Sequence, residues 1–104
     1  MDRFHLIGNA NRFEEIWVVD FEFQPLGQGE HVWPLCMVAE ELLRTRQIRL
    51  WRGEFGPEPP FDTGDDSLFI AYSAGAEFSC FLALGWQKPA HILDLYVEFI
   101  ALRN

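Results

Sequence analysis

A proline-rich segment divides this sequence into two parts that favour different kinds of secondary structure. The segment GPEPPFDTGDD, residues 56–66, contains three prolines and two glycines, and it is too short to hide a good helix. Runs rich in apolar and aromatic side chains come before it, at residues 15–23, 33–42 and 44–55. The sequence therefore predicts a loop at residues 56–66 between a strand-only part and a mixed part.

The strand-only part, residues 15–55, predicts an antiparallel meander because short turns separate its strands. The segment PLGQGEH, residues 25–31, is such a turn signal. In the third strand Ile48 and Leu50 alternate with polar neighbours and should point to one face of the sheet. The first strand is the most apolar, so we expect it to lie in the centre of the sheet.

The part after the loop predicts two strands that alternate with two helices. The predicted elements are, in order, a strand at 67–73, a helix at 76–85, a short strand at 91–95 and a helix at 95–104. Gly85 stands where the carboxyl end of a helix favours glycine. Together with the meander, these elements predict one α/β domain of 104 residues, with residues 1–14 as an N-terminal extension. The last helix runs into the chain end without a cap, which we interpret as a truncated domain.

The chain is strongly acidic, with a formal net charge of −8. Non-specific binding to duplex DNA depends on Lys and Arg, so this charge argues against a general nucleic-acid coat protein. It leaves room for an enzyme that acts on nucleic acid through metal ions held by acidic side chains. Four arginines form either a phosphate-facing stripe or the exposed face of a strand: Arg44, Arg46, Arg49 and Arg52.

Two cysteines, Cys36 and Cys80, lie in apolar surroundings and form no CxxC pair. We interpret them as buried free thiols, which fit a reducing compartment. No window approaches the roughly 20 apolar residues of a membrane span, and the N-terminus lacks the apolar core of a signal peptide. The expectation is a soluble intracellular domain.

The stretch WVVDFEFQP, residues 17–25, places two acids in a segment that otherwise predicts a buried strand. Asp20 and Glu22 are two residues apart and therefore share a face, while Phe21 and Phe23 lie on the other. Two neighbouring carboxylates repel each other unless a cation lies between them, and hard oxygen ligands suit Mg²⁺ or Mn²⁺. The pair predicts half of a divalent-metal site, or else a strand face turned to solvent.

Two further acids extend this candidate site. Glu77 lies at the start of the predicted helix 76–85, in an otherwise apolar run, and Asp94 precedes the last helix. Each has a structural alternative, because an acid near a helix N-terminus is favoured by the helix dipole and Asp is a common N-cap.

The segments VVDFEF, PLCMVAEEL, LFIAYSAGAEFSCFLALGW and ILDLYVEF together resemble the N-terminal part of a DnaQ-like 3′–5′ exonuclease. The resemblance is to the proofreading domains of phage and bacterial family A, DNA polymerase I-like, polymerases, and it spans residues 15–103. It implies a ribonuclease H-like mixed sheet and a two-metal site for Mg²⁺ or Mn²⁺. It also implies removal of the terminal nucleotide from a single-stranded 3′ end, in a cytoplasmic protein of a bacterium or of a phage-infected host.

The resemblance assigns roles to particular residues. Asp20 and Glu22 match the first motif, in which the Asp bridges both metals and the Glu binds one of them and helps to hold the attacking water. Glu77 takes the place of the second-motif Asp and is one carbon longer, so the resemblance makes it a third catalytic and metal-binding residue. Asp94 matches a supporting acid.

Four neighbours of the first motif are candidate substrate-binding residues. The family places backbone against the terminal nucleotide where this chain has Leu26 and Gly27. The rings of Phe21 and Phe23 are candidates for stacking on the terminal base, with a place in the core as the alternative. Trp33, Trp51 and Trp86 are expected to be packing residues.

Two departures from the family pattern limit the expected activity. The loop at residues 56–66 replaces a helix, and the third motif, a Tyr or His four or five residues before a final Asp, is absent. We therefore expect a weak or inactive exonuclease. The alternatives are a non-catalytic split or truncated module, completed by the remainder of a polymerase or a second chain, and an RNA-directed exonuclease of the same superfamily.

Overall fold

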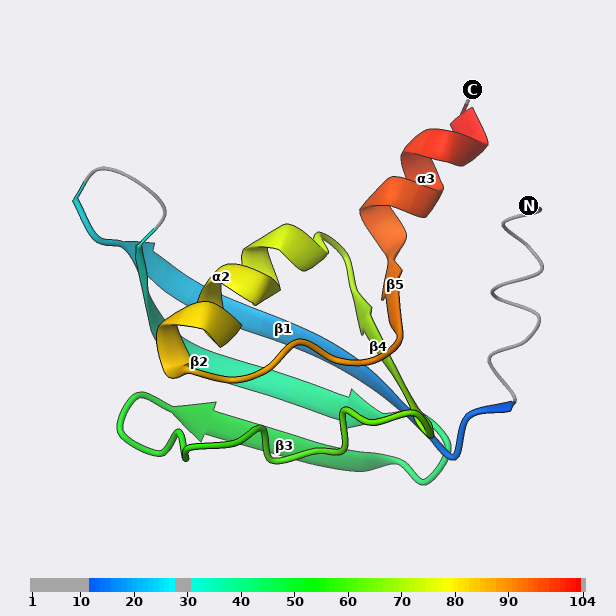
Figure 1. Cartoon of the computed structure of the whole chain (residues 1–104), viewed down its shortest axis with the longest axis horizontal. Coiled ribbons are helices and arrows are strands. Elements are labelled where there is room, and N and C mark those ends of the chain that lie inside the picture. The colour runs from blue at the N-terminus through cyan, green and yellow to red at the C-terminus, as the bar shows by residue number, and fades with distance from the viewer. Residues whose placement is uncertain (1–11, 28–30, 104) are drawn as a thin grey trace.

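A computed structural model describes residues 12–27 and 31–103 of the chain. Its elements, in order, are β1 (Glu15–Pro25), β2 (Val32–Glu41), β3 (Arg46–Trp51), β4 (Ser67–Ala71), α2 (Ala74–Leu84), β5 (Ile92–Asp94) and α3 (Leu95–Arg103). The strands form one five-stranded sheet in the order β3-β2-β1-β4-β5. The chain is therefore a small α/β domain, as the sequence predicts (Figure 1).

The direction of the strands changes at β1. β2 pairs antiparallel with β1, and β3 antiparallel with β2, which confirms the meander. On the other side β4 runs parallel to β1, and β5 parallel to β4. β1 is the middle strand of the five, as expected, and both of its faces contribute to hydrophobic clusters, although β4 is the more completely buried strand.

Helix α2 lies across one face of the sheet and encloses the larger core (Figure 1). Trp17, Val19 and Phe21 point toward this face because alternate residues of a strand share a side. They pack with Phe81 of the helix and Trp86 of the segment after it. Gly85 ends α2 in the left-handed conformation, with φ of 74°, as its place in the sequence predicts.

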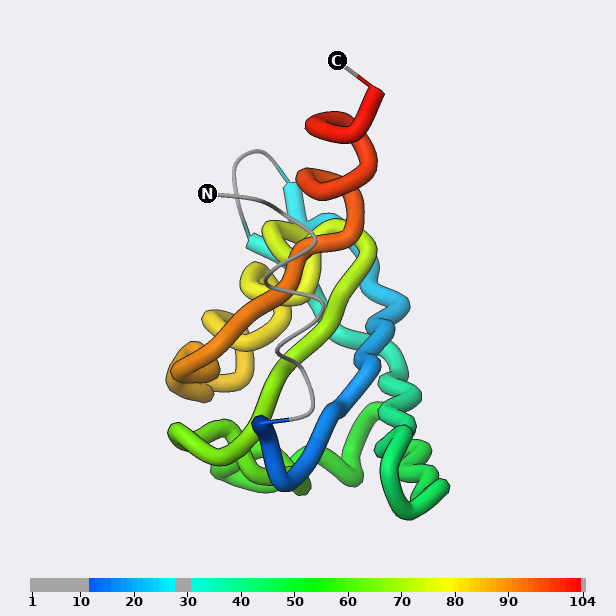
Figure 2. Tube along the Cα trace, turned by 90° about the vertical axis from the view of Figure 1, so that its right-hand side faces the viewer, coloured from blue at the N-terminus to red at the C-terminus, as the bar shows by residue number. Residues whose placement is uncertain are grey.

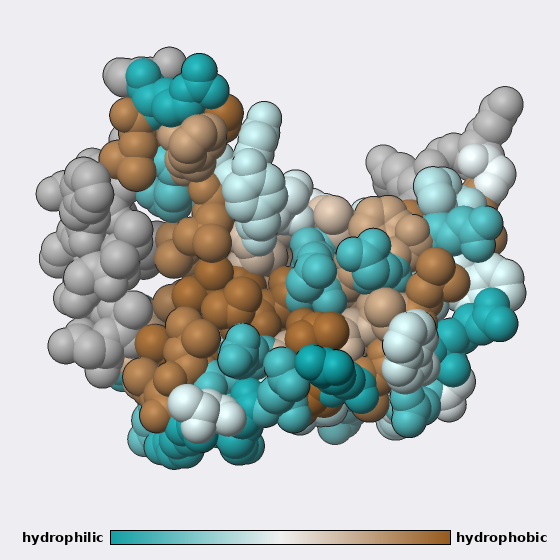
Figure 3. Space-filling view, turned by 180° about the vertical axis from the view of Figure 1, so that it is seen from behind, coloured by the Kyte–Doolittle hydropathy of each residue, from teal (hydrophilic) through white to brown (hydrophobic). Residues whose placement is uncertain are grey.

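Among residues 12–27 and 31–103, the opposite face of the sheet is only partly covered. A second cluster lies on the β4–β5 side and consists of Phe13, Ile16, Leu68, Ile70 and Leu93. The β1–β3 side carries exposed residues at alternate positions, among them Asp20, Val38 and Arg49. Figure 3 looks onto the molecule from this side and shows hydrophilic residues interleaved with hydrophobic ones.

The expected elements are present with shifted ends. β1 continues two residues past the expected end to Pro25, and β3 is shorter than predicted, beginning at Arg46 and ending at Trp51. Residues 56–66 form a loop, as expected. Residues 1–11 of the predicted extension lie outside the described residues. Within residues 12–27 and 31–103, no helix is long and apolar enough to cross a membrane.

Helix α3 differs from α2 in having no buried residue. Figure 2 shows it extending away from the strands. It contacts the domain at the residue after β4, where Tyr96 lies edge-on to Tyr72 with ring centroids 5.7 Å apart and donates its backbone N–H to the Tyr72 carbonyl. Its apolar side chains therefore face solvent on several sides of the helix.

Candidate functional site

The candidate site lies where β1 and β4 separate. Their parallel pairing runs from Glu15 and Ser67 to Val18 and Ile70 and goes no further along β1. This point also divides the sheet into its antiparallel and parallel halves. In open α/β sheets, ligands bind at such a switch in strand order, beyond the carboxyl ends of parallel strands. The next residues of β1 are Val19, Asp20, Phe21 and Glu22.

Where β4 no longer pairs with β1, the side chain of Glu77 in α2 takes its place as the hydrogen-bond partner of β1. Its Oε1 accepts a hydrogen bond of 3.0 Å from the backbone N–H of Phe21, which lies between Asp20 and Glu22 in the sequence. The side chain of Glu77 is only 4% exposed, so this bond satisfies a buried donor that no strand reaches. The structure thus places Glu77 against the backbone of the acid pair, although 56 residues separate it from Phe21.

The surroundings of Glu77 disfavour its charged form. Burial raises the pKa of Glu77 above its ordinary value, and the hydrogen bond from Phe21 opposes that shift. The negative charges of Asp20 and Asp94 raise the pKa further. These carboxylates are therefore electrostatic neighbours, and their repulsion adds to the effect of burial on Glu77.

Asp20 and Glu22 lie on the face of β1 opposite α2, as their spacing predicts, and both are exposed. A β-bulge follows Glu22, where the register shifts between Glu22 and Phe23. Bulges re-aim side chains and are frequent beside active sites.

The described part of the chain contains no group of three His, Cys, Asp or Glu side chains close enough to hold a metal ion. The carboxylates nevertheless have the right chemistry for a hard cation. Mg²⁺ commonly binds proteins through one or two carboxylates and takes its other ligands from water and substrate phosphates. Asp20 with Glu22 or Glu77 could supply such a pair, whereas a complete protein cage is not present among the described residues.

Asp94 is engaged with backbone donors. Its Oδ1 accepts hydrogen bonds from the N–H groups of Tyr96 and Val97 at 3.0 and 3.2 Å, which caps α3. Its Oδ2 accepts a bond of 3.0 Å from the N–H of Ala74 at the start of α2. Asp94 therefore joins the start of α2 to the start of α3.

The four candidate substrate-binding residues lie in different environments. Phe21 is 4% exposed, and its ring packs against Phe55, Phe81 and Trp86, so as placed it belongs to the core. Phe23 is half-buried against the same core. Leu26 and Gly27 are exposed at the end of β1. Gly27 has φ of 63°, a conformation that glycine adopts without strain.

The expectation for the tryptophans is wrong at two positions. Trp86 is a core residue, but Trp33 is 43% and Trp51 67% exposed. Both lie near the ends of their strands on the open side of the meander, where no helix covers them within the described chain. The sequence did contain a signal for the exposure of Trp51. It is two residues from Arg49 in the same strand, so the two side chains share the outward face.

The two cysteines are free, as expected. Cys80 is fully buried, whereas Cys36 is half-buried. Burial, together with the charge of Glu77, raises the pKa of Cys80 to about 12. The Cys80 thiol is therefore protonated at neutral pH and is a core residue beside the site.

Comparisons of the chain with protein-family models, with curated proteins and with solved structures found no match. The assignment of a function therefore depends on the residues and on their arrangement in this fold.

Proposed function

We propose that this chain is the N-terminal part of a divalent-metal-dependent 3′–5′ exonuclease domain with a ribonuclease H-like sheet, weak or inactive by itself. The substrate is the single-stranded 3′ end of DNA, whose terminal phosphodiester bond is hydrolysed. Asp20, Glu22 and Glu77 are the residues that carry this proposal.

The observation that supports the proposal best is the hydrogen bond from Phe21 N–H to Glu77. Residues of two motifs that are far apart in the sequence meet at the carboxyl side of the central strand, which is where an α/β sheet places a ligand. The meander followed by parallel strand–helix units also agrees with the ribonuclease H-like arrangement that the resemblance implies. Glu77 is also only 4% exposed, whereas an acid without a special role normally lies on the surface.

In this proposal Mg²⁺ or Mn²⁺ would be held by Asp20, together with Glu22 or Glu77. Such a cation supplies charge stabilisation for the attacking and leaving oxygens of the phosphate. The chain itself presents the Asp20 and Glu22 carboxylates on an exposed face. It holds Glu77 in one orientation through the Phe21 N–H, and it aligns α2 through the contact between Asp94 and Ala74.

A nuclease assay tests the catalytic part of the proposal. The chain is incubated with 3′-labelled single-stranded DNA and Mn²⁺, alongside Asp20→Ala and the exposed-surface control Leu82→Ala. We expect slow release of the terminal nucleotide that is lost in Asp20→Ala and kept in Leu82→Ala. Cleavage that Asp20→Ala retains would contradict the assignment, and faster cleavage of labelled RNA would favour the RNA-directed alternative.

Thermal unfolding tests metal binding without requiring turnover. A ligand that binds only the folded state stabilises it by about 2.7 kcal/mol at a concentration of 100 times its Kd. We expect Mn²⁺ to raise the Tm of the wild type and to raise it less in Glu22→Ala. If Mn²⁺ neither stabilises the wild type nor supports cleavage, the exonuclease proposal fails.

A second candidate function is a non-catalytic module of a polymerase or nuclease assembly. The exposed helix α3 favours it, because six of its apolar residues are between 37% and 55% exposed: Leu95, Tyr96, Val97, Phe99, Ile100 and Leu102. Exposed apolar surface of this kind marks a site of protein contact. Sedimentation that shows a monomer at all concentrations, together with metal-dependent cleavage, would count against this candidate.

A further inference from the structure

The register of the meander arranges the open sheet face in three cross-strand rows. Residues directly opposite in an antiparallel pair point to the same face. One row contains Val18, Glu40 and Gln47, the next Asp20, Val38 and Arg49, and the third Glu22, Cys36 and Trp51. Each proposed metal-binding acid of β1 therefore shares its row with an exposed residue of β3.

A fourth position on the same face continues this arrangement toward the end of the sheet. Trp33 pairs with Gln24, two residues beyond Glu22. The guanidinium of Arg52 lies over the Trp33 ring, 4.6 Å from its centroid. A hollow of about 540 Å³ lies on the α2 side of this pair, where Phe55 and Leu84 also line it. On the open face the exposed rings of Trp33 and Trp51 form a surface suited to flat, unsaturated groups.

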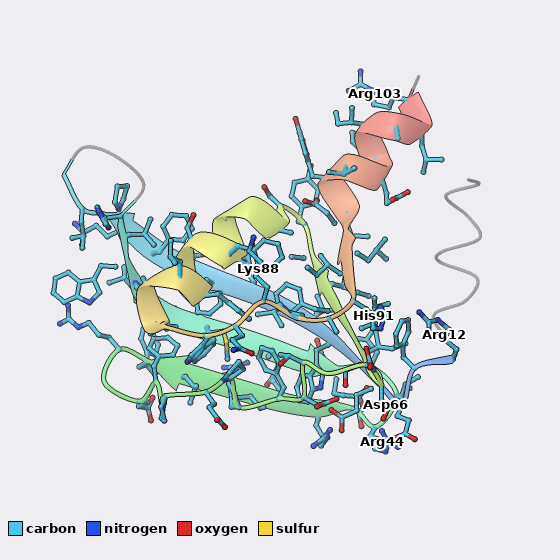
Figure 4. The ribbon with its side chains drawn as sticks, in the orientation of Figure 1. Arg12, Arg44, Asp66, Lys88, His91 and Arg103 are labelled. Atoms are coloured by element: carbon cyan, nitrogen blue, oxygen red, sulfur yellow. The ribbon has the colours of Figure 1, made fainter. Side chains whose placement is uncertain are left out.

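The four arginines of the stripe divide into two pairs. Arg46 forms an ion pair of 2.9 Å with Glu15, and Arg44 donates a hydrogen bond of 2.7 Å to the carbonyl of Glu14. Figure 4 shows Arg44 at the amino-terminal end of β1, near Asp66. In contrast, Arg49 has no hydrogen bond or ion pair with any described residue. The Arg52 guanidinium lies over the Trp33 ring and forms no hydrogen bond or ion pair within the described chain.

We infer that the surface formed by Trp33, Arg49, Trp51 and Arg52 is a binding track for single-stranded nucleic acid. This inference rests on the proposed function and adds the path by which the strand reaches the acids of β1. Bases stack on Trp51 and Trp33, and phosphates pair with Arg49 and Arg52. Stacking on aromatic side chains beside basic groups is how proteins bind single strands without reading their sequence.

The track can bind negatively charged phosphates although the chain is acidic, because Arg49 and the acids of β1 lie on different strands. The acids Asp20 and Glu22 lie on β1, whereas Arg49 and Trp51 lie two strands away on β3. Two strand spacings amount to about 10 Å, which is close to one screening length at physiological salt. A nucleic-acid strand bound along β3 therefore contacts the arginines and lies about one screening length from the carboxylates of β1.

A binding assay in EDTA tests the track separately from catalysis. The probe is a fluorescein-labelled oligothymidylate of about 12 nucleotides, within the range of known single-strand sites. We expect Trp51→Ala to weaken binding by about 5- to 150-fold, the range seen when one stacking aromatic is removed. Arg49→Gln should reduce the magnitude of the slope of log K against log salt by about 0.7, the value for one phosphate contact on a single strand.

Two matched controls keep the result specific. Leu82→Ala removes an exposed apolar side chain from α2, and Arg103→Gln removes an exposed cation from α3. Both should bind the oligonucleotide as the wild type does. Quenching of tryptophan emission gives a second readout, because Trp33 and Trp51 are exposed while Trp17 and Trp86 are buried.

Several outcomes would overturn the track. These are a wild type that does not bind the oligonucleotide in EDTA, or a Trp51→Ala variant that binds with wild-type affinity. Self-association of the wild type that Trp51→Ala abolishes would instead make this face an interface between copies. Asp20→Asn separates the two proposals: it should bind the strand at least as tightly as the wild type, while its loss of cleavage tests the exonuclease alone.

Discussion

Glu41 and Glu77 are two almost fully enclosed carboxylates whose pKa values move in opposite directions. Their side chains are 0% and 4% exposed, respectively. Burial acts to raise both pKa values, but at Glu41 the hydrogen bonds from the N–H groups of Ile16, Leu43 and Arg44, with the Arg44 charge, lower the pKa below its ordinary value. At Glu77 burial prevails over the hydrogen bonds from the N–H groups of Phe21 and of Glu77 itself, the charges of Asp20 and Asp94 add to the effect of burial, and the pKa is raised.

This difference separates a structural carboxylate from a candidate functional one. Both oxygens of Glu41 accept hydrogen bonds, at 2.7 to 3.2 Å, and they hold the turn after β2 against the start of β1. Glu77 is held against β1 by the bond from Phe21 N–H and has two negatively charged neighbours, and carboxylates with a pKa perturbed in this way are frequent at functional sites. Burial of an acid is therefore a poor guide to function until its donors and its charged neighbours are known.

Removal of Glu41 should have the largest effect on stability. Glu41→Ala leaves three backbone donors without their acceptor. We expect the three losses together to lower the free energy of unfolding by about 2–4 kcal/mol. Urea denaturation at neutral pH measures this value. A loss below about 0.5 kcal/mol, the range of ordinary surface substitutions, would show that Glu41 is not the structural anchor described above.

Replacement of Glu77 by glutamine should have a smaller effect of the opposite sign. Glu77→Gln keeps an oxygen acceptor for Phe21 N–H and removes the repulsion with Asp20 and Asp94, so we expect a gain of up to about 1 kcal/mol. Glu41→Gln is the matched comparison and should destabilise. If both variants changed the free energy of unfolding in the same direction, the contrast between the two acids would be lost.

The two acids should also give opposite slopes of stability against pH. The lowered pKa of Glu41 means that its contribution is present above the ordinary value of 4.5 and is lost as the pH falls through the folded pKa. The raised pKa of Glu77 means that its contribution is present below 4.5 and is lost as the pH rises through the folded pKa. Unfolding measured between about pH 3 and about pH 8 should show each slope flattened in the corresponding glutamine variant.

The reactivity of Cys80 tests the packing around Glu77, and it is the smallest of the expected effects. Because its pKa is raised to about 12, the thiol should resist iodoacetamide in the folded protein, whereas the half-buried Cys36 should react first. Mass spectrometry of the modified peptides before and after unfolding measures both rates. Equal modification of the two cysteines under native conditions would mean that the region around Glu77 opens readily.

Much of the fold could be predicted because its signals are local. Apolar alternation marks β1 and β3, the prolines of residues 56–66 mark the loop, and Gly85 marks the end of α2. The shared face of Asp20 and Glu22 follows from their spacing alone. The errors concern which side chains are exposed. Trp33 and Trp51 are of a residue type common in cores, yet each occupies an outward position of its strand.

The sequence by itself determined the order of strands and helices, the central place of β1 and the acid pair on one of its faces, because these depend on neighbours along the chain. Only the tertiary structure decided that Glu77 meets the backbone between Asp20 and Glu22, because that contact depends on where β4 leaves β1. It also decided that Asp94 caps α3 while holding α2. It likewise decided that Arg49 and Trp51 share rows with the acids, since strand register is set by pairing across the sheet.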